Sequence, residues 1–175
     1  MNLGKGNWIG LVVFFALYFF YLEGDEVMNF RLISESFEEN GTIPLKYTCH
    51  GEDVSPALSW KSVPLGTKSF ALIVDDPDAP GWTRIHWVVY NIPVEVTSFE
   101  EGETPKGSIQ GANDQGKCKY RGPCPPTGVH RYFFKLYALK QPLNLPKGAT
   151  KAQVEEAMKS LILGEAQLIG TYGSS

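Results

Sequence analysis

The chain has 175 residues, enough for one domain with a hydrophobic core and too few for two domains of ordinary size. Aromatic residues make up 13% of the sequence and charged residues 20%, which is typical of a globular protein and not of a disordered one. The formal net charge of −3 gives no basis for binding a polyanion, so we expect no nucleic-acid partner.

The N-terminus carries an uncharged apolar run, WIGLVVFFALYFFYL, at residues 8–22. The run is shorter than the roughly 20 residues of a membrane-spanning helix and fits a secretory signal or a short signal anchor. Lys5 precedes the run, and three acidic residues follow it within 23–26. Because positive charge tends to stay in the cytoplasm, we predict that residues 1–27 are a signal or membrane anchor and that domain 28–175 lies outside. The alternative is that the run is an ordinary buried segment of the fold.

Apolar or alternating runs, separated by turns rich in Gly and Pro, predict β-strands at 57–60, 69–75, 85–92, 131–139 and 166–171. The sequence has no internal repeat and no βαβ alternation that would indicate a parallel sheet. We therefore predict a mostly β domain.

One segment near the C-terminus is predicted to be helical. Thr150 and Gln153 have the spacing of a capping box. Apolar residues then recur at helical spacing from Val154 to Leu161, and Gly164 follows as the expected stop.

Two long segments lack apolar periodicity. Residues 97–107 (TSFEEGETPKG) are predicted to form a solvated surface loop without a function. Residues 109–128 contain prolines and aromatic residues, so we predict an ordered loop, and ordered loops of this length are usually functional.

Polar and ionisable residues lie at two points where an apolar run meets a Pro-rich turn. The turn Asp75–Pro80 ends one run, and His86 begins the next. The stretch 122–128 contains three prolines and two glycines and leads into His130 and a second apolar run. Proline fixes its own φ and glycine admits positive φ, so such a loop costs little entropy to hold in one shape.

These segments carry a family resemblance. The sequences DPDAP at 76–80 followed by His86, and GPCPPTGVHRY at 122–132, resemble the two signature regions of the phosphatidylethanolamine-binding protein family. The nearest branch is that of the bacterial and archaeal Raf kinase inhibitor-like proteins. Further matches are YTC at 47–49, SPALSW at 55–60, GAND at 111–114 and GTY at 170–172. The resemblance extends from about residue 28 to the C-terminus.

The resemblance implies antiparallel sheets packed as in that family and a small pocket that binds anions, including phosphoryl head groups. It also implies a non-enzymatic regulatory protein, without a cofactor, that inhibits a protease or kinase. Carried over position by position, the ligand-binding residues are Asp76, Asp78, His86, Tyr120, Gly122, His130 and Tyr132. A homodimer is left open.

The chemistry of these residue types agrees with an anion pocket. Backbone N–H groups of a glycine-containing loop can converge on an anion, and a histidine beside a carboxylate is a cationic donor. Tyr120 would add a neutral O–H donor. The two aspartates could orient the histidines or receive the amine of an ethanolamine head group.

Simpler roles compete with this interpretation. Asp76 and Asp78 could cap a turn, His86 could be a core histidine, and His130 could merely begin a strand. His50 is interpreted as a surface residue outside the site. Asp76, Asp78, His86 and His130 lack the local spacing of a familiar metal motif, so no metal site is predicted.

An enzyme is the alternative function. Asp and His together could do general acid–base work in a hydrolase or acyl-transfer enzyme. The sequence contains no Gly-x-Ser-x-Gly motif, and the one candidate nucleophile, Cys124, stands between prolines.

The three cysteines, Cys49, Cys118 and Cys124, cannot all pair within one chain, and none forms a Cys-x-x-Cys motif. One disulfide is expected outside the cytoplasm and three thiols inside. The resemblance favours Cys49–Cys124, because the prokaryotic branch often carries cysteine at both positions. It also makes Met28 a natural start, which would leave the protein in the cytoplasm.

Overall fold

The structure is a computed structural model, which describes Met1 and residues 29–173. The apolar run at 8–22, and with it the predicted signal or anchor, lies outside the described residues. Within the described part of the chain, no helix combines the length and apolarity needed to cross a membrane.

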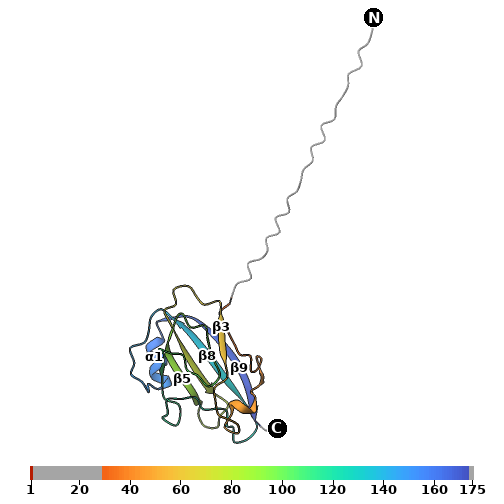
Figure 1. Cartoon of the computed structure of the whole chain (residues 1–175), viewed down its shortest axis with the longest axis vertical. Coiled ribbons are helices and arrows are strands. Elements are labelled where there is room, and N and C mark those ends of the chain that lie inside the picture. The colour runs from red at the N-terminus through yellow and green to blue at the C-terminus, as the bar shows by residue number, and fades with distance from the viewer. Residues whose placement is uncertain (2–28, 174–175) are drawn as a thin grey trace.

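The described residues of the domain form two β-sheets and one short α-helix (Figure 1), which confirms the predicted fold class. The smaller sheet has the order β1-β3-β6, with bounds Arg31–Ile33, Leu58–Lys61 and Ser98–Phe99. The larger sheet has the order β2-β9-β8-β4-β5-β7, with bounds Gly41–Thr42, Ile162–Gly173, Val129–Leu139, Ser69–Asp76, Arg84–Pro93 and Ile109–Gln110. All pairings are antiparallel except that of β2 with β9.

Strand β4 is buried along its whole length, because both faces of the larger sheet are covered. Phe70, Leu72 and Val74 face the core between the two sheets, where Trp60 of β3 meets Phe70 edge-on at a centroid distance of 5.3 Å. The alternate side chains pack on the opposite face, in a second core that includes Val154 and Met158 of the helix. A strand buried on both faces reads as a continuous apolar run, which is why β4 was predictable.

The helix α1 spans Lys151–Met158, and Thr150 and Gln153 form the predicted capping box at its start. The prediction that the helix extends to a stop at Gly164 was wrong. Gly164 lies inside β9, where a Cβ atom would come within 2.7 Å of Pro64 Cγ, so this glycine permits close packing and does not end the helix.

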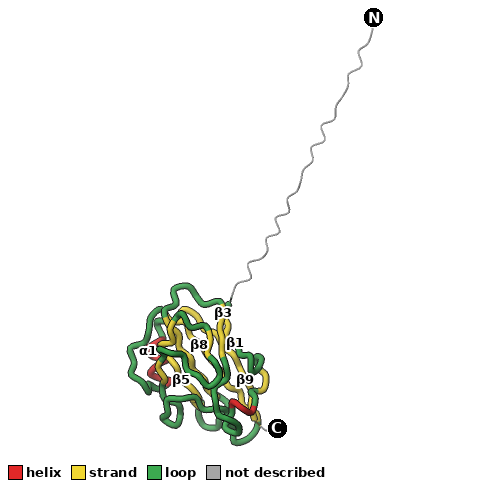
Figure 2. The backbone as a smooth tube through the Cα atoms, in the orientation of Figure 1, coloured by secondary structure: helices red, strands yellow, loops and turns green. Residues whose placement is uncertain are grey.

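The shortest strands were not predicted from the sequence. Strand β6 lies inside the segment 97–107, for which a solvated loop was predicted, and its Phe99 is buried in the core. Figure 2 shows how much of the remaining backbone consists of loops, which connect and flank the sheets.

Candidate functional site

The two sequence signatures meet where three neighbouring interior strands of the larger sheet, β8, β4 and β5, begin or end. Strand β4 runs antiparallel to both β5 and β8, so the last residue of β4 lies beside the first residues of the other two strands. This arrangement brings Asp76, His86 and His130 to the same place. They border a cavity of about 250 Å³, whose lining consists of Asp76, Ala79, Pro80, Arg84, His86, Arg121, Cys124, Pro125, Pro126 and His130.

His130 is held by a buried carboxylate. Its Nδ1 lies 2.7 Å from Oδ2 of Asp76, and both side chains are largely buried. The other carboxylate oxygen of Asp76 accepts the backbone N–H of Asp78 at 2.8 Å. Because Nδ1 is committed to Asp76, Nε2 is the ring nitrogen that His130 can offer to a ligand.

His86 is aimed by an irregularity in β5. The register shifts between Val74, which pairs with Trp87, and Asp75, which pairs with Ile85, so His86 is an extra residue in the ladder. Trp87 then packs in the core between the sheets and Ile85 packs against the opposite core, while His86 lines the cavity. A bulge commonly re-aims a side chain in this way.

A reciprocal pair of hydrogen bonds ties His86 to the loop that follows β7. Nδ1 of His86 lies 2.7 Å from the carbonyl oxygen of Arg121, and the backbone N–H of Arg121 donates to the carbonyl of His86 at 3.0 Å. A carbonyl only accepts, so Nδ1 carries the hydrogen and Nε2 is left free for the cavity. Burial lowers the pKa of His86 below its ordinary value, so the ring is neutral at neutral pH.

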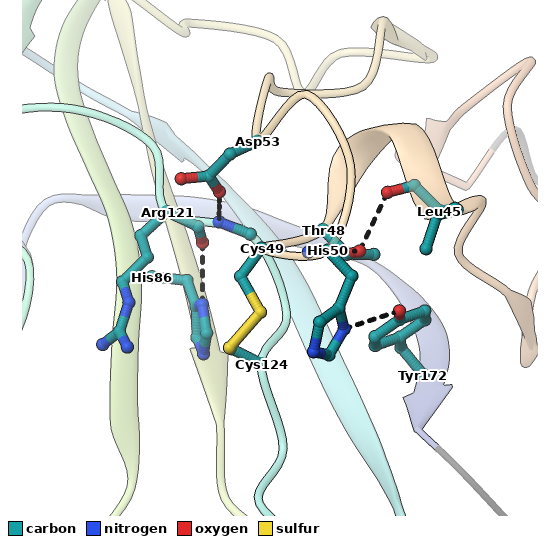
Figure 3. Close-up of a disulfide and its surroundings, with 10 residues drawn as sticks. Leu45, Thr48, Cys49, His50, Asp53, His86, Arg121, Cys124 and Tyr172 are labelled. Carbon is teal, nitrogen blue, oxygen red and sulfur yellow. Dashed lines mark hydrogen bonds between the residues drawn. A yellow bond between two sulfur atoms is a disulfide. The ribbon is translucent and has the colours of Figure 1, made fainter.

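Two arginines give the cavity positive charge. Arg84 has Asp114 at 3.8 Å and stacks on the Trp82 ring at 4.2 Å. The guanidinium of Arg121 has no carboxylate within 4.0 Å among the described residues and points to the same side as the His86 ring (Figure 3). Arginine keeps its charge at all relevant pH values, so the lining carries two guanidinium groups and one carboxylate, Asp76. Asp114, outside the lining, offsets part of the charge of Arg84, whereas Arg121 has no such partner among the described residues.

The loop that forms one wall is fastened to the rest of the domain by a disulfide. Cys49 and Cys124 are joined, with their Cα atoms 5.5 Å apart (Figure 3). The N–H of Cys49 also donates to the carbonyl of Pro123 at 3.1 Å. These bonds hold the Pro-rich wall in one position.

The structure places the other four predicted site residues outside the cavity lining. Asp78 is taken up by an ion pair, because its carboxylate accepts the backbone N–H, Nε and Nη2 of Arg131 at 2.8–2.9 Å. These hydrogen bonds lower the pKa of Asp78 to about 2.

Tyr120 and Gly122 have structural partners. The Tyr120 hydroxyl is buried and donates to the carbonyl of Tyr47 at 2.9 Å, and burial raises the pKa of its hydroxyl. The N–H of Gly122 donates to Asp53 at 2.6 Å and is therefore not free for an anion. A Cβ atom at Gly122 would come within 2.4 Å of the Tyr47 carbonyl oxygen, so only glycine allows this approach.

Tyr132 packs against His86 outside the cavity lining. Its ring meets the His86 ring edge-on at 5.2 Å, and burial raises the pKa of its hydroxyl. No described residue is within hydrogen-bonding geometry of this buried hydroxyl. Tyr132 therefore contacts the site through its ring, which packs against His86, and does not line the cavity.

Sequence reasoning missed Arg84 and Arg121. Both positions had a signal: Arg84 stands two residues before His86, and Arg121 stands between the predicted Tyr120 and Gly122.

Within residues 29–173, Asp76, Asp78, His86 and His130 do not bring three ligand atoms within 4.8 Å of one another, as a metal ion would require.

The amino-acid sequence is similar to one protein family and to several individual proteins. The family model described as phosphatidylethanolamine-binding protein matches residues 33–173. A UPF0098 protein from Methanothermobacter thermautotrophicus is 56% identical over 147 residues, covering 81% of this chain and 97% of its own. A protein from Mycobacterium tuberculosis whose name describes it as a lipoprotein is 42% identical, covering 81% of this chain and 71% of its own.

Two solved structures of proteins described as members or homologues of this family have a fold similar to that of this chain. A crystal structure of a phosphatidylethanolamine-binding protein homologue from Chlamydia trachomatis has a TM-score of 0.80 and 41% identity, covering 84% of this chain and 99% of its own. The structure of Escherichia coli YbcL, described as a member of the mammalian family, has a TM-score of 0.79 and 33% identity, covering 84% of this chain and 99% of its own.

Proposed function

Because the chain belongs to the phosphatidylethanolamine-binding protein family, we propose that it is a non-enzymatic binding protein whose cavity takes a small anion or a phosphoryl group. The observation that carries this proposal is the convergence of two fixed histidines with two arginines. Nε2 of His86 and of His130 are the unused nitrogens of rings whose Nδ1 atoms are already bonded. Arg84 and Arg121 line the same cavity and supply the positive charge.

The anionic end of the ligand is the end that this site recognises. Both aspartates already have partners, His130 for Asp76 and Arg131 for Asp78. An ammonium group would have to compete with those partners for a carboxylate. We therefore expect phosphoethanolamine and inorganic phosphate to bind with similar affinity.

Anion affinity should increase as pH falls. Burial lowers the pKa of His86, and a bound anion would favour the protonated ring, so binding takes up a proton. Sulfate is the cleanest probe, because its own charge is constant over the range. Calorimetry from about pH 8 to about pH 5 should show affinity rising by up to tenfold per pH unit for each proton taken up. A pH-independent affinity would contradict the role of His86.

The same sulfate titration tests the roles of His130 and Arg121. His130→Ala or Arg121→Ala should weaken sulfate binding about tenfold or more, because each removes a charge-assisted hydrogen bond. The matched control is His50→Ala, which removes an exposed histidine outside the cavity lining. Equal losses from His50→Ala and His130→Ala would refute the assignment.

The enzyme alternative rests on the Asp76–His130 pair. Its one candidate nucleophile, Cys124, is in a disulfide, and no described serine or threonine hydrogen-bonds either cavity histidine. The inhibitor role is supported by the exposed loop at 126–128, which lies between the disulfide and β8. A rigid exposed loop is a suitable surface for a protease or kinase to bind.

Two assays on one protein sample separate these functions. We expect no turnover of ester, peptide or phosphoester substrates above buffer, and dose-dependent inhibition of at least one serine protease or kinase in a panel. Substitution Thr127→Arg, on the exposed loop, should abolish inhibition without changing sulfate affinity. Saturable turnover that disappears with Asp76→Asn would establish the enzyme instead.

We also propose that residues 1–27 hold the domain on the outer face of a membrane. The charge pattern around the run at 8–22 and the disulfide both support this placement, because disulfides persist in oxidising compartments. Mass spectrometry of the native chain from fractionated cells should find the chain in the membrane fraction, beginning at Met1. A chain in the soluble cytoplasmic fraction that begins at Met28 would contradict the anchor.

A further inference from the structure

A cluster of metal-ligating side chains lies beside the cavity, on the exposed side of the disulfide. The Sγ atoms of Cys49 and Cys124 and a ring nitrogen of His50 all lie within 4.8 Å of one another. Figure 3 shows the His50 ring next to the disulfide, with its second nitrogen on the side away from Tyr172. We propose that reduction of this disulfide creates a binding site for one thiophilic metal ion, with Zn²⁺ as the reference ion.

The donor set fits such an ion. Two thiolates and one imidazole are the ligands that Zn²⁺ prefers, and they leave a fourth tetrahedral position for water. Zn–S bonds of about 2.3 Å place two sulfurs about 3.8 Å apart around one ion. The three ligand atoms are already within 4.8 Å, so small side-chain rotations suffice once the sulfurs separate.

His50 is oriented for this role by a partner from another element. Its Nδ1 lies 2.9 Å from the hydroxyl of Tyr172, near the end of β9. When Nδ1 donates to that hydroxyl, Nε2 carries the lone pair that a metal ligand needs. This contact also gives a role to Tyr172, which the anion cavity does not use.

The two cysteines would stay side by side after reduction, because other bonds hold their segments together. The Cys49 N–H donates to the carbonyl of Pro123, next to Cys124, at 3.1 Å. The Gly122 N–H donates to Asp53 at 2.6 Å, and the Tyr120 hydroxyl donates to Tyr47 at 2.9 Å. These bonds join the segments around Cys49 and Cys124 without the disulfide.

The chemistry is balanced with a thiol reductant. Two low-molecular-weight thiols reduce the disulfide to two cysteine thiols and leave as their own disulfide. Binding of Zn²⁺ then releases two protons as the thiols become thiolates. The site shares Cys124 with the cavity lining but uses neither His86 nor His130, so metal binding is tested by its own titration, whatever the outcome of the sulfate titration.

The test uses the full chain with Cys118→Ser, which removes the third thiol. After reduction with a phosphine, we expect one equivalent of Co²⁺ to bind with a thiolate charge-transfer band, and Zn²⁺ to displace it. The oxidised chain should show no such band. His50→Ala should weaken Zn²⁺ binding about tenfold or more, and Tyr172→Phe should weaken it measurably, whereas the control His130→Ala should not.

Three results would overturn the proposal: no charge-transfer band in the reduced chain, equal metal binding by the oxidised chain, or unchanged affinity in His50→Ala. If the reduced chain unfolds without metal, thermal unfolding decides. Zn²⁺ must then restore a cooperative transition in the reduced chain, and His50→Ala must abolish that effect. Absence of a Zn²⁺-dependent transition would equally refute the site.

Discussion

The reciprocal hydrogen bonds between His86 and the backbone of Arg121 are the constraint on which the rest of the site depends. They join a strand of the larger sheet to a loop with little regular structure, and they use both the ring and the main chain of His86. A carbonyl acceptor fixes the position of the ring hydrogen, so the ring has one nitrogen to offer and one direction in which to offer it. The same contact places Arg121 at the cavity. Loss of this contact would free the histidine and the arginine together.

The sheet supplies the geometry for that contact. An antiparallel arrangement of β5, β4 and β8 brings the end of one strand beside the starts of its two neighbours, so signatures far apart in the sequence converge. The bulge at His86 turns this side chain toward the cavity while its neighbour Trp87 stays in the core. The disulfide then fixes the wall formed by the loop. Positioning by a rigid scaffold, with the ligand groups at strand ends and loops, is how a small site keeps its shape without a ligand.

Much of this could be predicted from the sequence, and the failures have physical reasons. The strands β4, β5 and β8 were predictable because they are long and buried, whereas β6 consists of two residues defined only by their partner strand. Gly164 was misread because a glycine needed for close packing looks the same in sequence as a helix stop.

At the site, the residue types were predictable but their partners were not. Asp76 and Asp78 are separated by a single proline. Asp76 nevertheless holds a cavity histidine, whereas Asp78 pairs with an exposed arginine. Tyr120 and Gly122 came from the resemblance, and their hydrogen bonds to Tyr47 and Asp53 could not be read from any local pattern. Arg121 was missed because its contribution depends on a backbone contact, which its side chain does not reveal.

Nitrogen NMR of the histidine rings tests the central claim most directly. We predict that His86 carries its hydrogen on Nδ1 and that burial keeps the pKa of this ring below the ordinary value for histidine. Added sulfate should shift the Nε2 resonances of His86 and His130. The Nε2 of His50 should not respond to sulfate. A hydrogen on Nε2 of His86, or a sulfate response at His50 and not at the cavity histidines, would contradict the role of His86 and His130 in the site.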